Sequence, residues 1–522
     1  MVRVTSAAQA AARDAAAIAA GVSSRTLMQR AGAAAASEIA RLFSSRLGDM
    51  NTGHVSILAG PGDNGGDAWV VARALAVSGA DVLVSQVGEC KGASACAERA
   101  LAADRVQEGS FETRPIIVDG LLGTGAHGEP RGAIATAIEL INRARATGSV
   151  VVALDVPSGL DSTTGESTLA VAADVTLTFG TLKRGLLLAR GIAGRILVLD
   201  IGLGHGPVGL GDEAPSLVNG DWVHRRLPGI PPDAHKGTRK RLVIIGGAVG
   251  MAGAPALAAR AAMRSGVGMV RMLVAAENVP VVQSLEPFAL AGPWPRVGGP
   301  NPNEDADVRD NISEWADCVL IGPGLGTSDQ ARSLAEYVLR VWRGPVVLDA
   351  DALNVFRDRA VDLGAMLEGR AALLTPHPAE FGRLLGVDTS EVLARRFEIG
   401  SELARKTNAT VLLKGVPTVV TDPVKGSVVS ASGTPVLAAA GSGDLLSGIA
   451  ATLLAQCGDA LTSGACAAWI HGRAAEIATR GGGVRGVTLD EVVYCLRRAW
   501  TSRGGDLHYP VLADLPAVAS RA

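Results

Sequence analysis

The chain has 522 residues, which is enough for two or three domains. Its charges nearly balance, with 49 lysines and arginines against 51 aspartates and glutamates, and only 3% of the residues are aromatic. We expect no nucleic-acid partner, because the chain has neither a basic block nor a supply of stacking side chains. We also expect no membrane partner and a cytoplasmic location, because long uncharged apolar runs are absent and Arg13 and Asp14 interrupt the Ala-rich N-terminus.

The cysteines show neither a CxxC pair nor a spacing typical of a metal site. The six are Cys90, Cys96, Cys318, Cys457, Cys466 and Cys495. Reduced thiols are the expectation for all of them.

The first part of the chain alternates strand-like and helical patterns. A helical pattern covers 5–47. Strand-like runs follow at 54–59, 81–87, 115–119, 149–155, 174–179 and 195–200. Helical segments separate most of them, at 67–78, 91–104 and 132–147. This alternation predicts a doubly wound α/β domain with a parallel sheet, which we place at 1–210.

A second α/β block follows an interval rich in glycine, proline and aspartate, from which we predict a linker at 211–235 and a second domain at 236–522. Strand-like runs occur at 241–245, 268–274, 317–321, 345–349, 371–375, 410–414 and 417–421. Helices are expected at 253–265, 328–342, 391–406 and after Asp444. The two blocks share no short repeat, which indicates two different domains on one chain.

The segment 437–450, LAAAGSGDLLSGIA, combines a glycine turn with a carboxylate. Gly441 and Gly443 precede a predicted helix, whose free N–H groups and dipole attract phosphate. Asp444 would repel phosphate, so it makes sense as the acceptor of a proton from a hydroxyl that attacks the phosphate. The alternative is a glycine turn in which Asp444 only caps the helix.

Other loops of the second block carry residues suited to a ligand. The glycines at 246–255 and 321–326 permit close approach of the backbone. Lys414 ends a predicted strand and suits a phosphate, or it is a solvated strand end. Glu380 lies near a helix start, where it binds a ligand or caps the helix. Asp349 and Asp351 either orient a ligand or cap a turn.

Six motifs of this block carry a family resemblance: GMAGAP, IGPGLG, DADALN, PHPAE, LLKG and AGSGD. In this order, over roughly the last 290 residues, they resemble the ADP-dependent NAD(P)H-hydrate dehydratases of the ribokinase-like superfamily. The resemblance implies repair of NAD(P)H that has been hydrated at C6 of the nicotinamide ring. The nucleotide phosphorylates the C6 hydroxyl, and phosphate then leaves to restore the double bond.

The resemblance also implies site residues in the second domain. The nucleotide contacts are Lys414, Gly415, Val416, Pro417, Thr418 and Gly443. The residues lining the hydrate site are Ala254, Gly324, His377 and Asp444, with Asp444 as the catalytic base. Glu380 resembles the acidic residue that helps to organise Mg²⁺, here through water. Many relatives have an asparagine and paired glycines upstream of the anion loop, where this chain has 434–436 (TPV) and 439–440 (AA).

The first domain has a glycine loop of its own, AGPGDNGGDAW, after a predicted strand. Gly60, Gly62 and Gly65 satisfy the dinucleotide fingerprint GxGxxG, and Glu89 could serve as its ribose acid. The carboxylates of Asp63 and its neighbours argue against a simple pyrophosphate loop.

Three oxygen donors near strand ends, Asn64, Asp119 and Ser158, could together form a site for a hard cation. Each alone is more simply a turn residue. The motifs DNGGD, DGLLGTG and DVPSG, with LMQRAG in the N-terminal helix, jointly resemble the NAD(P)H-hydrate epimerases over roughly residues 1–210. Asp63 stands where that family more usually has asparagine.

This second resemblance implies a Rossmann-like domain that interconverts the R and S hydrates. Asn64, Asp119 and Ser158 would hold K⁺, and Asp155 would be the acid/base group. The implied hydrate-binding residues are Asp63, Asn64, Gly65, Gly66, Asp67, Gly123, Thr124, Gly125, Ala126, His127, Gly128, Glu129 and Asp155.

Together the two resemblances predict a bifunctional enzyme that clears both epimers of hydrated NADH and NADPH. ADP or ATP would be the co-substrate, with Mg²⁺ and K⁺ as cofactors, and we expect a homo-oligomer. The alternative is an ATP-dependent ribokinase-like kinase of a small molecule, with a non-catalytic binding module at its N-terminus.

Overall fold

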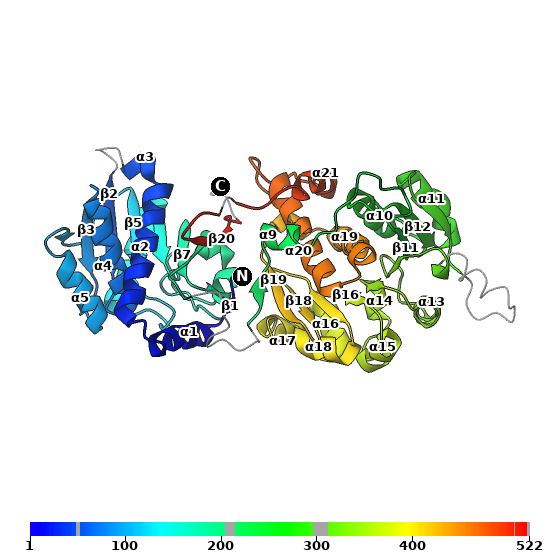
Figure 1. Ribbon diagram of the computed structural model, residues 1–522, viewed down its shortest axis with the longest axis horizontal. Helices are drawn as coiled ribbons and strands as arrows, with labels where there is room; N and C mark the ends of the chain where they lie inside the picture. Colours follow the sequence, from blue (N-terminus) through cyan, green and yellow to red (C-terminus); the bar gives the residue numbers. More distant parts are fainter. Residues whose placement is uncertain (48–52, 204–213, 296–311, 506, 519–522) are drawn as a thin grey trace. The chain divides into compact units, whose positions relative to one another are not determined.

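The computed structural model describes residues 1–47, 53–203, 214–295, 312–505 and 507–518 (Figure 1). It divides into two compact units. One comprises Met1–Leu217 and Gly505–Ala522, and the other comprises Val218–Gly504. No helix of the described residues is both long enough and apolar enough to cross a membrane.

The first unit has a doubly wound sheet with the strand order β20-β9-β7-β6-β5-β2-β3-β4. Its parallel strands are β2 (His54–Ala59), β3 (Asp81–Gln86), β4 (Gln107–Glu108), β5 (Ile116–Gly120), β6 (Val150–Leu154), β7 (Val175–Phe179) and β9 (Arg195–Leu199). The edge strand β20 (Val511–Leu515) pairs antiparallel with β9. The predicted parallel sheet is confirmed.

Helices cover both faces of this sheet. Their bounds are α1 (Ala7–Ala19), α2 (Ser24–Leu42), α3 (Ser44–Leu47), α4 (Asp63–Val77), α5 (Ala93–Ala102), α6 (Gly132–Ala146), α7 (Arg184–Leu188) and α8 (Arg190–Ala193). Ile39 of α2 and Trp69 of α4 are buried in one core, and Ile138 of α6 is buried in the other. A separate two-stranded sheet joins β1 (Val4–Thr5) to β8 (Leu182–Lys183) and thereby ties the N-terminus to the region after β7.

The second unit has a mixed sheet that includes the strand order β19-β18-β17-β16-β15-β14-β11-β12-β13. Its parallel strands are β11 (Arg241–Ile245), β12 (Met269–Val274), β13 (Leu290–Pro293), β14 (Cys318–Ile321), β15 (Val346–Leu348), β16 (Ala372–Leu374) and β17 (Thr410–Leu413). The strands β18 (Thr418–Asp422) and β19 (Gly426–Ser430) are antiparallel. The predicted α/β architecture is therefore confirmed here too.

Two buried cores flank the second sheet. Ile449 and Ile470 belong to one, and Phe381 and Leu403 to the other. The α-helices are α9 (Gly220–His224), α10 (Gly253–Arg264), α11 (Val279–Leu285), α13 (Asp329–Val341), α14 (Asp351–Asn354), α15 (Ala360–Leu367), α16 (Pro378–Leu385), α17 (Thr389–Ala394), α18 (Gly400–Thr407), α19 (Ser442–Cys457), α20 (Ala460–Ala478) and α21 (Leu489–Ala499).

The structural units differ from the predicted boundaries in two places. The predicted linker contains α9, and Trp222 and Val223 are buried in the core of the second unit. The last described segment, which we assigned to the second domain, contributes β20 to the sheet of the first unit. Arg195 and Asp514 reinforce that pairing with two hydrogen bonds of 2.9 and 2.7 Å. Pairing between strands so far apart in the sequence leaves no local signal.

The prediction of reduced thiols is wrong for one pair, because Cys90 and Cys96 form a disulfide. The turn after β3 brings their Cα atoms within 5.8 Å, which spacing alone did not reveal. Among the described residues, Cys318, Cys457 and Cys466 are free, as is Cys495.

Candidate active sites

The loops that follow the parallel strands of the second unit converge, as the ends of neighbouring strands should. A Cβ added to Gly324 would lie 3.2 Å from the Cβ of Ala254, so the loops after β11 and β14 touch. A Cβ added to Gly322 would lie only 1.8 Å from the carbonyl oxygen of Asp349, which follows β15. Ala254, Gly324 and Asp349 therefore belong to one region, as predicted for the first two.

The glycine turn before α19 has the geometry of an anion site. Gly441 has a φ of +92°, which favours glycine, and α19 begins at Ser442. Asp444 lies in the first turn of this helix. A Cβ on Gly443 would lie 3.1 Å from the Nζ atom of Lys414, so an ammonium group stands beside the helix N-terminus. Both features favour a phosphate at this place.

A buried ion pair holds Lys414 there. Its Nζ atom donates a hydrogen bond of 2.5 Å to Oδ1 of Asp349, a residue with a relative exposure of 1%. Its backbone N–H donates to the carbonyl of Pro376 at 2.9 Å, which joins the ends of β16 and β17. Burial disfavours the ammonium, but Asp349 and Glu380 outweigh it, and the pKa of Lys414 is raised. Lys414 is thus not a solvated strand end.

Asp444 has the protonation behaviour of a general base near neutral pH. Burial raises the pKa of its carboxyl to about 7, Asp349 adds to the rise, and Lys414 opposes it. A base with a pKa close to the working pH accepts and releases a proton most effectively. The N-cap position of α19 is Gly441 and not Asp444, which argues against the capping alternative.

Glu380 does cap its helix. Its Oε2 atom accepts a hydrogen bond of 2.8 Å from the backbone N–H of His377, and Nδ1 of His377 accepts from the N–H groups of Ala379 and Glu380. Burial raises the pKa of Glu380, and burial followed by the charge of Lys414 lowers the pKa of His377. The charge of Lys414 acts on both His377 and Glu380, so both residues lie at the edge of the site around Lys414.

The predicted nucleotide segment 414–418 forms the turn between β17 and β18. Gly415 has a φ of +148°, and the bond between Val416 and Pro417 is cis. Arg396 supports the turn, because its Nη1 atom donates to the carbonyl of Val416 at 2.6 Å. Arg396 is buried, at 5% exposure, and no sequence motif points to it because it lies between α17 and α18.

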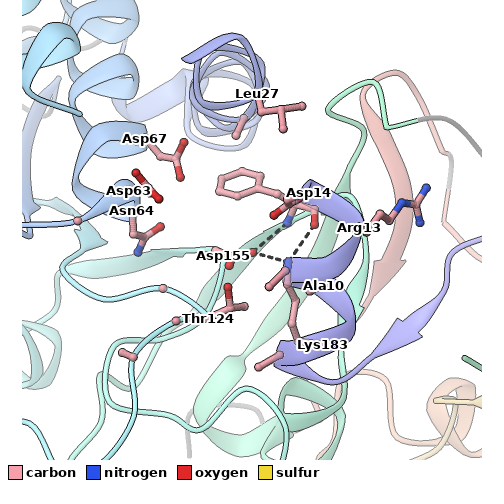
Figure 2. Close-up of a pocket in the computed structure, with 18 of the residues that line it drawn as sticks. Ala10, Arg13, Asp14, Leu27, Asp63, Asn64, Asp67, Thr124, Asp155 and Lys183 are labelled. Atoms are coloured by element: carbon pink, nitrogen blue, oxygen red, sulfur yellow. Dashed lines mark hydrogen bonds and ion pairs between the residues drawn. The ribbon is translucent and has the colours of Figure 1, made fainter. Parts of the chain in front are cut away.

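The first unit contains a cavity of about 940 Å³ at the predicted epimerase site (Figure 2). Its walls come from α1, from the start of α4, from the loop after β5 and from the residues that follow β6. Nine of the predicted residues line it: Asp63, Asn64, Asp67, Gly123, Thr124, Gly125, Ala126, His127 and Asp155.

Gly65 and Gly66 do not line the cavity but allow α4 to pack closely. A Cβ on Gly65 would lie 2.0 Å from the carbonyl oxygen of Gly60, and one on Gly66 would lie 2.5 Å from the end of Met28. Gly128 and Glu129 are not among the lining residues either.

Asp155 has the most constrained backbone of this site. Its φ is +61°, an unfavourable value for a residue with a side chain, and such strain often marks a functional position. Its Oδ1 atom accepts a hydrogen bond of 2.5 Å from Nζ of Lys183 and longer ones, of 3.3 Å, from Thr178 and from the N–H of Phe179. No motif points to Lys183, which lies in the short strand β8 that pairs with β1.

The three predicted cation ligands meet around Leu122. Its carbonyl accepts a hydrogen bond of 2.8 Å from Nδ2 of Asn64, and its N–H donates to Oγ of Ser158 at 2.9 Å. Ser158 in turn donates to Oδ1 of Asp119 at 2.6 Å. Burial raises the pKa of Asp119 to about 6, although hydrogen bonds from Ser158 and Leu121 oppose the rise. Oδ1 of Asn64 is buried and has no hydrogen-bond partner among the described residues, so a cation would satisfy this oxygen.

The geometry disfavours a pyrophosphate at the start of α4. Asp63 occupies the first turn of this helix, and Asp67 lies one turn later and faces the same cavity. The carboxylate of Asp63 at this helix N-terminus would repel a dianion. The fold and sites thus define a two-domain α/β protein, with a carboxylate-rich cavity in one unit and, in the other, a helix N-terminus beside a lysine that favours an anion.

Comparison with known proteins identifies the family. The family model described as NAD(P)H-hydrate dehydratase matches residues 242–498, and the one described as YjeF-related protein N-terminus matches residues 24–185. The bifunctional NAD(P)H-hydrate repair enzyme of Coxiella burnetii is 35% identical over 92% of this chain and 96% of its own length. That of Thermanaerovibrio acidaminovorans is 36% identical over 92% and 95%. The chain belongs to the family of bifunctional NAD(P)H-hydrate repair enzymes, as both resemblances predicted.

Among solved structures, an ADP/ATP-dependent NAD(P)H-hydrate dehydratase from Bacillus subtilis, co-crystallised with ATP and Mg²⁺, is 28% identical to this chain. The match covers 55% of this chain and 98% of that one, with a TM-score of 0.49.

Proposed function

We propose that the chain repairs hydrated NADH and NADPH with two active sites. The first unit interconverts the R and S hydrates, and the second dehydrates the S hydrate at the expense of ADP, releasing AMP and phosphate. Membership of the family supports this pairing, and each unit contains a site with suitable chemistry. ATP is the other candidate co-substrate.

The convergence of Lys414, Gly443 and Asp444 carries the proposal for the second site. The N–H groups at the start of α19 and the ammonium of Lys414 stabilise the phosphoryl group during transfer. Asp444 accepts the proton of the C6 hydroxyl while that oxygen attacks the terminal phosphorus. Hydroxide is a poor leaving group and phosphate is a good one, so the C–O bond then breaks, a proton leaves C5 and the C5–C6 double bond returns.

The surroundings of Lys414 suit Mg²⁺ as well. Oδ2 of Asp349 is buried and has no hydrogen-bond partner in the described part of the chain, and the Glu380 carboxylate lies at the same site. No group of three or more histidine, cysteine, aspartate or glutamate side chains suited to a metal occurs among the described residues, so contact through water fits better than direct ligation. When bound with the nucleotide, Mg²⁺ supplies charge neutralisation for the phosphates.

In the first unit, Asn64, Asp119 and Ser158 would hold K⁺, which supplies a fixed positive charge at the edge of the cavity. Asp155 would transfer protons at C6 of the hydrate. The hydrate would lie in the cavity between the start of α4 and the loop after β5 (Figure 2).

Incubation of the pure protein with ADP and hydrated NADH tests the function. We expect the absorbance of the reduced nicotinamide to recover. A ribokinase-like kinase would instead accumulate a stable phosphorylated product and leave the absorbance unchanged. Absence of recovery with both ADP and ATP would contradict the proposal.

A further inference from the structure

The epimerisation cavity contains a lysine that has no role in the proposed function so far. Lys183 of β8 is 3% exposed. Its Nζ atom donates to Oδ1 of Asp155 at 2.5 Å (Figure 2). It also donates to the carbonyl of Phe179 at 2.9 Å and to Oγ1 of Thr178 at 3.1 Å. An ammonium group has three protons, so these bonds satisfy it fully and fix the Asp155 carboxylate in one position.

A second carboxyl group, that of Asp67, faces the same cavity from α4. Unlike Asp155, it forms no ion pair in the described part of the chain. Burial, followed by the negative charges of Asp155 and Asp63, raises the pKa of Asp67 well above its usual value. Two carboxyl groups that share a cavity of low polarity seldom ionise together.

We propose that Lys183 is a positioning residue that gives the two carboxyl groups different roles. Its ion pair makes Asp155 the proton acceptor and leaves Asp67 as the proton donor. The inference rests on the proposed epimerase function of this cavity. Each group comes from a different element, Lys183 from β8, Asp67 from α4 and Asp155 from the end of β6. A substrate between them can therefore exchange protons with two sides of the cavity.

Inversion at C6 needs both a donor and an acceptor. The donor gives its proton to the C6 hydroxyl, the C–O bond breaks, and its electron pair leaves with water while the lone pair of N1 forms an N1–C6 double bond. Water then adds to the opposite face, the N1–C6 π pair returns to N1, and the acceptor takes a proton from the added water. The net result is the inverted alcohol and one proton moved from Asp67 to Asp155, which the reverse reaction or exchange with solvent restores.

The other ionisable groups around the cavity do not duplicate Lys183. Arg13 and Asp14 line it from α1, Asp63 from α4 and His127 from the loop after β5. No other lysine is found among its lining residues. Burial raises the pKa of Asp14, and the charge of Lys183 opposes the rise.

The test uses the full chain and pure R hydrate, with Lys183→Met, Lys183→Arg and Asp67→Asn. Lys91→Met is the matched control, because Lys91 is exposed and lies outside the cavity. We expect Lys183→Met to lower kcat for epimerisation by about 100-fold with little change in KM, and to move the acid limb of the pH profile to higher pH. Lys183→Arg should restore the position of that limb. Asp67→Asn should lower kcat and remove the basic limb.

Dehydration of S hydrate and thermal unfolding of the same samples report on folding. A wild-type rate and pH profile in Lys183→Met would overturn the inference while the epimerase function stands. An effect of Lys183→Met that is confined to KM would overturn it too. So would a folded Lys183→Arg variant whose acid limb lies at the same pH as that of Lys183→Met. A wild-type chain that leaves R hydrate unchanged would overturn the epimerase function itself, and the inference with it.

Discussion

Both units place an aspartate–lysine ion pair at the carboxyl ends of parallel strands, yet the two pairs have different surroundings. Asp155 and Lys183 are joined at 2.5 Å in the first unit, as are Asp349 and Lys414 in the second. In the second unit the lysine faces the glycine turn before a helix. In the first, carboxyl groups crowd the start of the helix. The same pair therefore suits phosphate in one place and proton transfer in the other.

The largest effect should come from Asp444→Asn, which removes the proton acceptor of the second site but keeps its shape. We expect dehydration of S hydrate to fall by about 1,000-fold or more, with ADP affinity nearly unchanged. Absorbance recovery and calorimetric titration with ADP measure the two quantities. If the variant unfolds instead, Asp444 stabilises α19 and is not the proton acceptor.

Asp155→Asn tests the first site independently of the second. Turnover of R hydrate should fall by about 100-fold, because the carboxylate held by Lys183 is lost, while S hydrate is still repaired at the wild-type rate. Chiral chromatography of the remaining hydrate provides the measurement. Equal turnover of R hydrate by the variant and the wild type would exclude Asp155 as the acid/base group.

Removal of Lys414 should have an intermediate effect. Lys414→Met alone would leave a buried charge on Asp349, so we prefer to combine it with Asp349→Asn. Loss of a charge-assisted hydrogen bond of about 2 kcal/mol predicts ADP binding weakened about 30-fold in the double variant. Calorimetry measures the affinity, with Asp349→Asn as the control. Unchanged affinity would mean that the lysine does not meet the phosphates.

The pH dependence of dehydration should be the smallest effect. The pKa of Asp444 is raised to about 7, so a lower pH protonates the base and a higher pH ionises it. The rate at saturating substrate should therefore rise about tenfold between about pH 6 and 8 and then level off. A flat profile over this range would show that Asp444 does not titrate during the reaction.

Local patterns predicted much of this molecule. The alternation of apolar runs predicted most strands of both sheets but not β4, β13, β19 or β20, and the strand ends predicted the converging loops around Lys414 and Asp155. The single helix predicted at 391–406 is two helices, α17 and α18, and the helical pattern at 5–47 is three, because the turns between them are too short to interrupt the pattern.

What the sequence could not supply depends on long-range pairing. Lys183 reaches its cavity through a two-residue strand that pairs with the N-terminus, and β20 joins a sheet more than 300 residues upstream. Arg396 supports the nucleotide turn from a helix junction. None of these residues stands in a motif, so only the fold reveals what they contact.

The central claim is that one chain repairs both epimers through two separate sites. An equal mixture of R and S hydrates with ADP tests it directly, in the wild type, Asp155→Asn and Asp444→Asn. We predict complete recovery of the reduced nicotinamide by the wild type, recovery of only the S portion by Asp155→Asn, and no recovery by Asp444→Asn. Complete and equally fast recovery by Asp155→Asn, or recovery by Asp444→Asn, would contradict the claim.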